Sequence, residues 1–196
     1  MPMRLDTDSR TGAVTAACNQ IIAEDGIQGL TMRAIGRVCG VSPASLHHHY
    51  TSKERLLGVV VRRTGRARHA YISGRARTEG PMAFLPAEPD DVIDARCWQG
   101  WLELWRSEPS LEPILSGARA KDRALLALSV DYQLDRAGLD AVQAMIDGLL
   151  VALCAPHRPL PPPRARQGLS GYLGLVLPGR AVTEVVLPPY WDYASA

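Results

Sequence analysis

Residues 31–56 read TMRAIGRVCGVSPASLHHHYTSKERL, and they predict a helix, a tight turn, a second helix and the start of a third. Thr31 is a candidate N-cap, because its hydroxyl can accept a hydrogen bond from a free N–H of the first turn. Gly40 ends the first helix, since glycine adopts a left-handed conformation without a Cβ clash. Ser42 is a second candidate N-cap, and Pro43 suits the first helical position, which needs no N–H. This order of elements is typical of a helix-turn-helix.

The second helix of this pattern is expected to present a polar, sterically small face at its N-terminal end. Ala44, Ser45, His47 and His48 would point outward, and Leu46 would point inward. In a helix-turn-helix protein that reads DNA, these outward positions meet base edges in the major groove. Lys53 begins the third helix, where a positive charge and a helix N-terminus together favour a phosphate.

The same stretch resembles the tetracycline-repressor (TetR) family of transcriptional regulators. With the preceding helix, the resemblance covers roughly residues 10–68. Gly36 and Cys39 replace the usual alanines, and Tyr50 replaces the usual phenylalanine. His47 stands where the family usually has a tyrosine that contacts the DNA backbone. The positions that match the family pattern are Thr31, Arg33, Ile35, Gly40, Val41, Ser42, Ser45, Leu46, His49, Ser52, Lys53, Glu54 and Leu56.

The resemblance implies an all-α, homodimeric transcriptional regulator, most simply a ligand-responsive repressor of a palindromic operator. It implies a three-helix DNA-binding domain with the start of a linking helix over residues 1–68. Residues 69–196 would form a helical regulatory and dimerisation domain with a non-helical tail from Pro178. The residues expected to contact double-stranded DNA are Ser42, Pro43, Ala44, Ser45, His47 and His48 in the groove, and Thr31, Arg33, Tyr50 and Lys53 at phosphates.

The distribution of charge along the chain fits this division. Residues 1–68 contain ten Lys/Arg and five Asp/Glu, whereas residues 69–196 contain twelve and fifteen. A basic first third suits a domain that binds nucleic acid. Taken alone, the imbalance is better explained by ordinary solvated charges.

The second part of the chain predicts further helices near 91–107, 111–118, 121–136, 139–155 and 164–176. A loop with four Gly/Pro residues is expected at 78–90, at the boundary between the two parts. The family resemblance implies that the last two helices form the dimer interface. The expected interface residues are Val142, Ile146, Leu149, Leu150, Leu153, Gly168, Leu169, Gly171, Tyr172 and Leu173. Alternatively, the glycines of the last helix simply weaken it.

Three tryptophans lie at positions i, i+3 and i+7 of the helix expected near 91–107. The family resemblance implies a small-molecule pocket in this part of the chain, and we expect some of these tryptophans to line it for an effector of unknown identity, since ligand sites are mostly apolar. The alternative is that tryptophans at helical spacing belong to the core. The candidate ligand-binding residues are Trp98, Trp101, Trp105, Tyr132 and Met145.

Other classes of function are weakly supported by the sequence. His47, His48 and His49 point about 100° apart on a helix, so they are not expected to share a metal ion. We find no nucleophile elbow, phosphate-binding loop or paired Cys ligands, and so expect neither catalysis nor a cofactor. The first ten residues lack an apolar run, and no segment is apolar enough to cross a membrane, which suggests a cytoplasmic protein with reduced cysteines. The alternative function is a helical dimer that binds small molecules without sequence-specific DNA binding.

Overall fold

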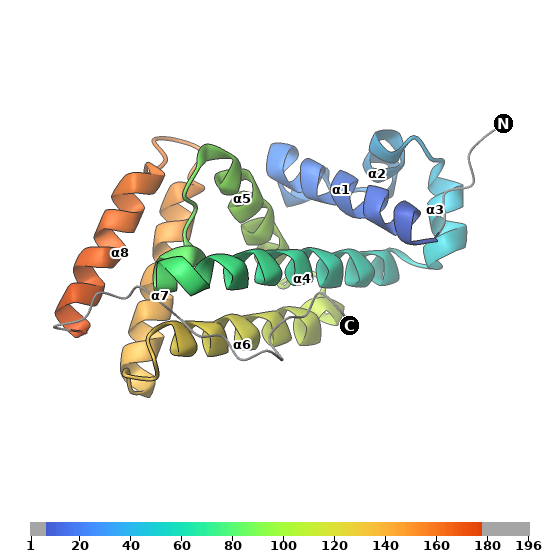
Figure 1. Cartoon of the computed structure of the whole chain (residues 1–196). Helices are drawn as coiled ribbons and strands as arrows, with labels where there is room; N and C mark the ends of the chain where they lie inside the picture. The colour runs from blue at the N-terminus through green and yellow to red at the C-terminus, as the bar shows by residue number, and fades with distance from the viewer. Residues whose placement is uncertain (1–6, 178–196) are drawn as a thin grey trace. The chain divides into compact units, whose positions relative to one another are not determined.

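The computed structural model describes residues 7–177, and these form eight α-helices and three 3-10 helices without a strand among them (Figure 1). The predicted all-α class is therefore confirmed. The predicted non-helical tail from Pro178 lies outside the described residues.

The chain forms two compact units. The first comprises the residues up to Gly65 together with Arg96–Gly117, and the second comprises Arg66–Ala95 and the chain from Ala118 onward. This division differs from the predicted single boundary after residue 68. The physical reason is that the chain returns to the first unit at Arg96 and contributes further helical turns to its core.

The first unit contains α1 (Thr7–Asp25), η1 (Ile27–Gly29), α2 (Met32–Cys39), α3 (Pro43–Tyr50) and the first turns of α4 (Lys53–Glu79). Helix α1 packs against α2, and α2 packs against α3. As the helical spacing of its apolar residues predicts, α1 buries Val14, Cys18, Ile21 and Ile22. Gly26 has a φ of 71° and separates α1 from the short turn that leads to α2.

Helix α5 (Pro89–Leu104) completes the core of the first unit with its second half. A Cβ atom at Gly100 would lie 2.3 Å from Cγ2 of Ile22, so the glycine allows α1 and α5 to approach closely. Trp101 is 0% exposed, and its Nε1 donates a hydrogen bond of 3.1 Å to Oδ1 of Asn19 on α1. The short 3-10 helix η3 (Pro109–Leu111) and the first turns of α6 (Glu112–Ser129) also belong to this unit.

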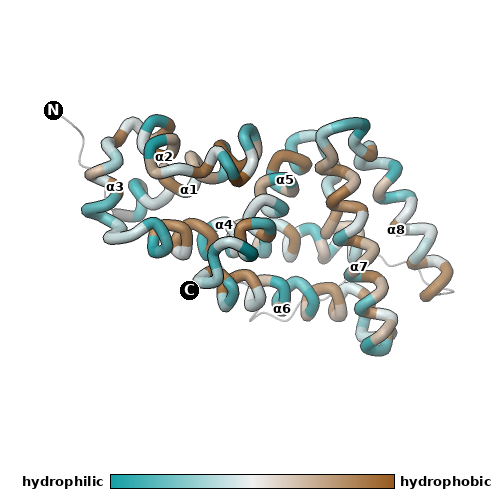
Figure 2. Tube along the Cα trace, turned by 180° about the vertical axis from the view of Figure 1, so that it is seen from behind, coloured by the Kyte–Doolittle hydropathy of each residue, from teal (hydrophilic) through white to brown (hydrophobic). Residues whose placement is uncertain are grey.

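The second unit is built around an apolar core shared by α4, α6, α7 (Arg136–Leu153), α8 (Pro162–Val176) and η2 (Gly80–Phe84). Phe84 and Leu85 are buried in this core with Leu125 of α6 and Leu169 of α8. Figure 2 shows apolar residues (brown) recurring along α4 and α7 between polar ones (teal), as expected for helices that bury one face.

Three local predictions are wrong, each for a physical reason. The expected loop at 78–90 is mostly structured, since α4 runs to Glu79 and η2 follows at once with its apolar side chains buried. Instead of the two helices expected at 111–118 and 121–136, one continuous helix, α6, spans Glu112–Ser129. The break expected between the helices at 121–136 and 139–155 lies earlier, before Arg136, so that Gly138 does not separate two helices. Instead it lies in the first turn of α7, where its N–H donates to the side chain of the N-cap Asp135 at 2.8 Å.

The expected dimer interface also needs correction, because six of its residues are buried within the chain itself. Helical periodicity identifies a buried face, but it does not say whether the same chain or a second copy covers that face. Leu149, Tyr172, Gly168 and Gly171 remain partly or fully exposed. The six that lie in the core of the second unit are Val142, Ile146, Leu150, Leu153, Leu169 and Leu173.

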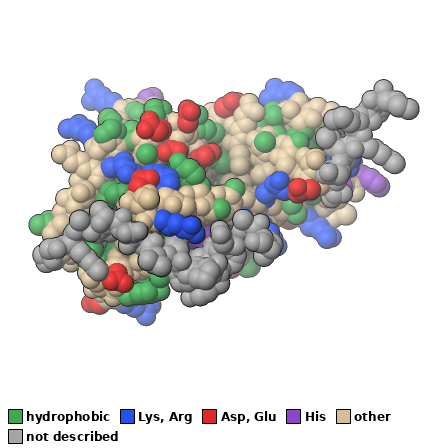
Figure 3. All heavy atoms as spheres, viewed as in Figure 1, with side chains coloured by type: hydrophobic (Ala, Val, Ile, Leu, Met, Phe, Trp, Pro, Cys, Tyr) green, Lys and Arg blue, Asp and Glu red, His purple; other side chains and the backbone are tan. Residues whose placement is uncertain are grey.

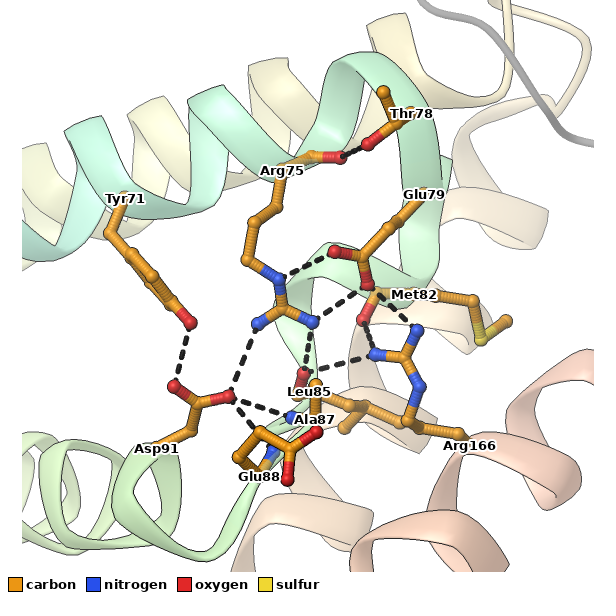
Figure 4. Close-up of polar contacts among 10 residues, drawn as sticks. All are labelled: Tyr71, Arg75, Thr78, Glu79, Met82, Leu85, Ala87, Glu88, Asp91 and Arg166. Atoms are coloured by element: carbon orange, nitrogen blue, oxygen red, sulfur yellow. Dashed lines mark hydrogen bonds and ion pairs between the residues drawn. The ribbon is translucent and has the colours of Figure 1, made fainter.

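Within the second unit, two arginines surround one carboxylate, Glu79 at the end of α4 (Figure 4). Arg75 donates two parallel hydrogen bonds to the Glu79 carboxylate, at 2.8 and 2.7 Å. Arg166 of α8 donates to the same carboxylate at 2.7 Å and to the carbonyl of Met82 at 2.9 Å. These bonds connect α4, η2 and α8, and such charge-assisted pairs are stronger than neutral hydrogen bonds.

The same group of side chains also organises the start of α5. Asp91 accepts a hydrogen bond from the Tyr71 hydroxyl at 2.6 Å and from the N–H groups of Ala87 and Glu88 at 2.9 and 3.1 Å. One Arg75 nitrogen lies 3.8 Å from its carboxylate. On the face drawn in Figure 3, basic (blue) and acidic (red) side chains lie next to one another.

These contacts lower the pKa of Glu79. The hydrogen bonds from Arg75, and then those from Arg166, favour the charged carboxylate and outweigh the cost of its partial burial. The contribution of Glu79 to stability is therefore fully present above its ordinary pKa of 4.5 and is lost as the pH falls through the lowered value.

None of the helices between residues 7 and 177 combines the length and the apolar character that a membrane span requires.

Replacing Glu79 with glutamine should destabilise the protein by about 1–3 kcal/mol at pH 7, because two arginines then lose their shared carboxylate. The difference from the wild type should narrow below pH 4.5, where the wild type also loses this charge. Urea unfolding at pH 7 and at lower pH measures both effects. The exposed Glu103→Gln is the matched control and should change little. An equal difference at every pH would contradict the assigned role.

Candidate nucleic-acid interface

Helices α2 and α3 are defined by hydrogen bonds at each end. The Thr31 hydroxyl oxygen accepts from the Ala34 N–H at 3.1 Å, and Ser42 caps α3 in the same way through the Ser45 N–H at 3.1 Å. Gly40 ends α2 in the left-handed conformation, with φ 68° and ψ 27°. Pro43 occupies the first turn of α3. All four capping predictions are therefore confirmed.

The turn between these helices is unusually tight at Gly36. The Val41 N–H donates to the Gly36 carbonyl at 2.9 Å. A Cβ atom on Gly36 would lie only 2.6 Å from the carbonyl oxygen of Val41. The glycine therefore allows the chain to fold back on α2 more closely than an alanine would, and this sets the start of α3.

Helix α3 presents the polar face that the sequence predicts. Helix α3 exposes Ala44, Ser45, His47 and His48. Leu46, in contrast, is 2% exposed and packs into the core of the first unit, which we call the head. Ser42 and Pro43 are exposed at the same end of the helix. A helix with a small and polar exposed N-terminal half can enter a major groove and place hydrogen-bonding groups against base edges.

Thr31 and Arg33 are exposed at the start of α2. Because the Thr31 oxygen accepts the capping bond, its own proton stays available as a donor to a phosphate. Arg33 carries a permanent positive charge with several donors. Both side chains can therefore donate hydrogen bonds to phosphates of the DNA backbone. Such contacts position a protein on DNA without reading its sequence.

Tyr50 does not share this exposed position. Its side chain is 6% exposed, and its hydroxyl oxygen is enclosed by the protein without a hydrogen-bonding partner. Its ring meets the His49 ring edge-on, with the centroids 4.7 Å apart. The buried ring of Tyr50 therefore belongs to the core of the first unit, which disagrees with the expected phosphate contact.

Lys53 has a partner that the sequence did not predict. Its ammonium group lies 3.4 Å from a carboxylate oxygen of Glu108, which precedes η3 in the same unit. The side chains of Lys53 and Glu108 are 40% and 20% exposed. The two residues are 55 positions apart, so no local sequence pattern could have paired them.

The candidate ligand-binding residues are not brought together within one unit. Trp98 and Trp101 are buried in the first unit, to which Trp105 also belongs, whereas Tyr132 and Met145 belong to the second. Tyr132 is 68% exposed in the turn after α6. Trp98 and Trp101 are buried, as the core alternative expects, and their part in a ligand pocket stays a prediction. In the described part of the chain, no three His, Cys, Asp or Glu side chains are arranged to hold a metal ion.

Comparison with known proteins decides the family. Residues 14–60 match the family model described as bacterial regulatory proteins, tetR family. The HTH-type transcriptional regulator BetI of Rhizobium meliloti (strain 1021) is 42% identical over 155 residues, which cover 72% of this chain and 76% of that protein. The chain belongs to the TetR family. The resemblance expected from residues 31–56 is thereby confirmed.

Other relatives of this TetR-family chain match over shorter regions or by fold. UidR of Escherichia coli (strain K12), also an HTH-type transcriptional regulator, is 38% identical over 53 residues. This match spans 27% of the chain and only 26% of UidR. A transcriptional regulator from Rhodococcus sp. Rha1 superposes with a TM-score of 0.75 at 22% identity, covering 91% of this chain and 99% of that one. The multidrug binding protein EbrR, complexed with ethidium, superposes at 0.58 with 21% identity over 85% of this chain and 99% of that one. These two structures support the fold.

Replacing Gly36 with alanine should destabilise the head by about 1–3 kcal/mol, because the new methyl group forces the Val41 carbonyl away. Denaturant unfolding measures the loss. Gly117→Ala is the matched control, since a Cβ there meets nothing within 4 Å in α6 and the alanine should cost nothing. If both substitutions have the same effect, the close approach at Gly36 is not what shapes the turn.

Proposed function

We propose that this protein is a DNA-binding transcriptional regulator, acting as a homodimeric, ligand-responsive repressor of a palindromic operator. The observation that carries the proposal is the exposed N-terminal face of α3, formed by Ala44, Ser45, His47 and His48. The regulators BetI and UidR, to which the chain is similar, support it.

In this proposal α3 lies in the major groove. Ser45, His47 and His48 contribute most of the base contacts, because their side chains donate and accept hydrogen bonds. Thr31, Arg33 and Lys53 hold phosphates. With no arginine on this face of α3, discrimination also depends on DNA shape and on the spacing of the two half-sites. Those half-sites would lie about 34–36 Å apart or at a multiple of that distance.

A homodimer is supported by an exposed face with little side-chain bulk on the last two helices. Gly168, Gly171 and Leu175 share one face of α8, and Leu175 is 80% exposed. A Cβ at either of these glycines would meet nothing within 4 Å. Val151, 61% exposed, lies on α7 one turn after the equally open Gly148. Such an apolar face with accessible backbone suits close packing against a second copy.

The response to a ligand is supported more generally. A small molecule that binds two conformations with different affinity shifts the protein toward one of them. EbrR, whose fold is similar, is a multidrug binding protein that binds ethidium. The alternative function, a helical dimer that binds small molecules without reading DNA, makes the opposite prediction for duplex binding.

Selection from a pool of random duplexes should enrich a palindromic sequence. Affinity for that sequence should fall steeply as the salt concentration rises, because phosphate contacts release counterions. The double variant Ser45→Ala, Lys53→Ala should lose binding by at least about tenfold, since it removes a base contact and a phosphate contact. Arg77→Ala, an exposed basic residue of α4 in the second unit, is the control for loss of one charge.

A folded dimer that enriches no sequence and binds no duplex at low salt would reject the DNA-binding function. It would leave the alternative of a small-molecule binder.

Replacing Leu175 with aspartate should convert the dimer into a monomer. In the proposed dimer this side chain lies against the partner, so the new carboxylate would be buried without a partner of opposite charge. Light scattering coupled to size-exclusion chromatography gives the molecular mass directly. Ile93→Asp, which removes another exposed apolar side chain (51% exposed) from α5, should leave the dimer intact. A dimeric Leu175→Asp variant would place the interface elsewhere.

A further inference from the structure

We propose that Glu108 competes with DNA for Lys53, so that the acid acts as an internal brake on the phosphate site at the start of α4. This inference rests on the proposed DNA-binding function and adds a means of regulating it. It concerns one ion pair, between the Lys53 ammonium and the Glu108 carboxylate, whose N···O distance is 3.4 Å.

Lys53 is the first residue of α4, where the proposed phosphate would lie. The neighbouring Ser52 hydroxyl oxygen already accepts from the Arg55 N–H at 3.2 Å, so Ser52 has a capping role. Lys53 and the exposed Arg55 are then the side chains in the first turn of α4 that supply a positive charge. In the structure the charge of Lys53 is directed to Glu108.

Glu108 is held in place by its backbone. Its N–H donates to the Leu104 carbonyl at 2.9 Å, and its carbonyl accepts from the Leu111 N–H at 3.0 Å. The side chain makes no capping bond to η3. The carboxylate is therefore positioned beside Lys53 by the turn between α5 and η3, without itself supporting that turn.

A phosphate and Glu108 cannot share Lys53 without cost. Both are negative, and like charges at such short range repel each other. The ammonium group sits on a flexible stem and can change partners. Because the pair is partly exposed, water and salt weaken it, so the brake should reduce affinity by a few-fold and should not abolish binding.

The chain connects this brake to the second unit. Helix α6 begins at Glu112, four residues after Glu108, and continues without a break to Ser129. Its residues from Ala118 onward belong to the second unit.

The decisive experiment compares the isosteric variants Glu108→Gln and Glu112→Gln. Glu112 is an exposed acid in the first turn of α6, so this control removes the same charge nearby. The probe is a 30-base-pair duplex of fixed arbitrary sequence, because phosphate contacts do not depend on sequence. Affinity is measured at low salt for each variant, in the wild-type background and in Lys53→Met, after denaturant unfolding has verified that each variant is folded.

Glu108→Gln should bind the duplex about two- to fivefold more tightly than Glu112→Gln does. This gain in affinity should disappear in the Lys53→Met background, because there is then no ammonium group for which Glu108 and a phosphate could compete. A gain of equal size in both backgrounds would indicate a general charge effect and would overturn the proposal. Equal affinities for the two glutamine variants would overturn it as well.

The two proposals fail in distinguishable ways. Duplex binding by the wild type, with no specific effect of Glu108, overturns only the competition. A folded wild type that binds no duplex at low salt overturns the DNA-binding function and the competition together.

Discussion

In this chain the turn from α2 into α3 is shaped by the close approach between Gly36 and the Val41 carbonyl. Because no side chain separates them, the chain can turn directly from α2 into α3. The Ser42 cap then starts α3, and burial of Leu46 fixes which face of that helix points outward. The exposure of Ser45 and of the histidines follows from these contacts, because packing the apolar face of a helix fixes its rotation about its own axis.

In the second unit, ion pairs between charged side chains at the edge of the core help to hold the helices together. Arg75 and Arg166 share Glu79, and both arginines also donate hydrogen bonds to backbone carbonyls, Arg75 to that of Leu85 and Arg166 to that of Met82. One carboxylate thus connects two helices and closes a turn. Apolar side chains from α6, α7 and α8 form the buried core of the same unit. Burial supplies most of the stability, and the ion pairs orient the ends of the helices.

Lys53 links these structural themes to function. In the proposed competition, DNA phosphates and Glu108 contend for the same ammonium group, which would give the protein a graded control over affinity without any change in the groups that read bases. The cost is small because the ion pair is partly exposed. The same reasoning explains why the capping residues are poor points of control, since their oxygens are required by the helices themselves.

The sequence by itself determined the all-α class, the helix-turn-helix and the outward face of α3. These depend on short-range rules of capping, glycine conformation and helical periodicity, which act over a few residues. Only the tertiary structure decided that α5 returns to the head, that Trp101 bonds to Asn19, that six apolar residues of α7 and α8 are internal, and that Glu108 holds Lys53. Each of these joins positions far apart in the chain, and periodicity shows that a face is buried without naming what covers it.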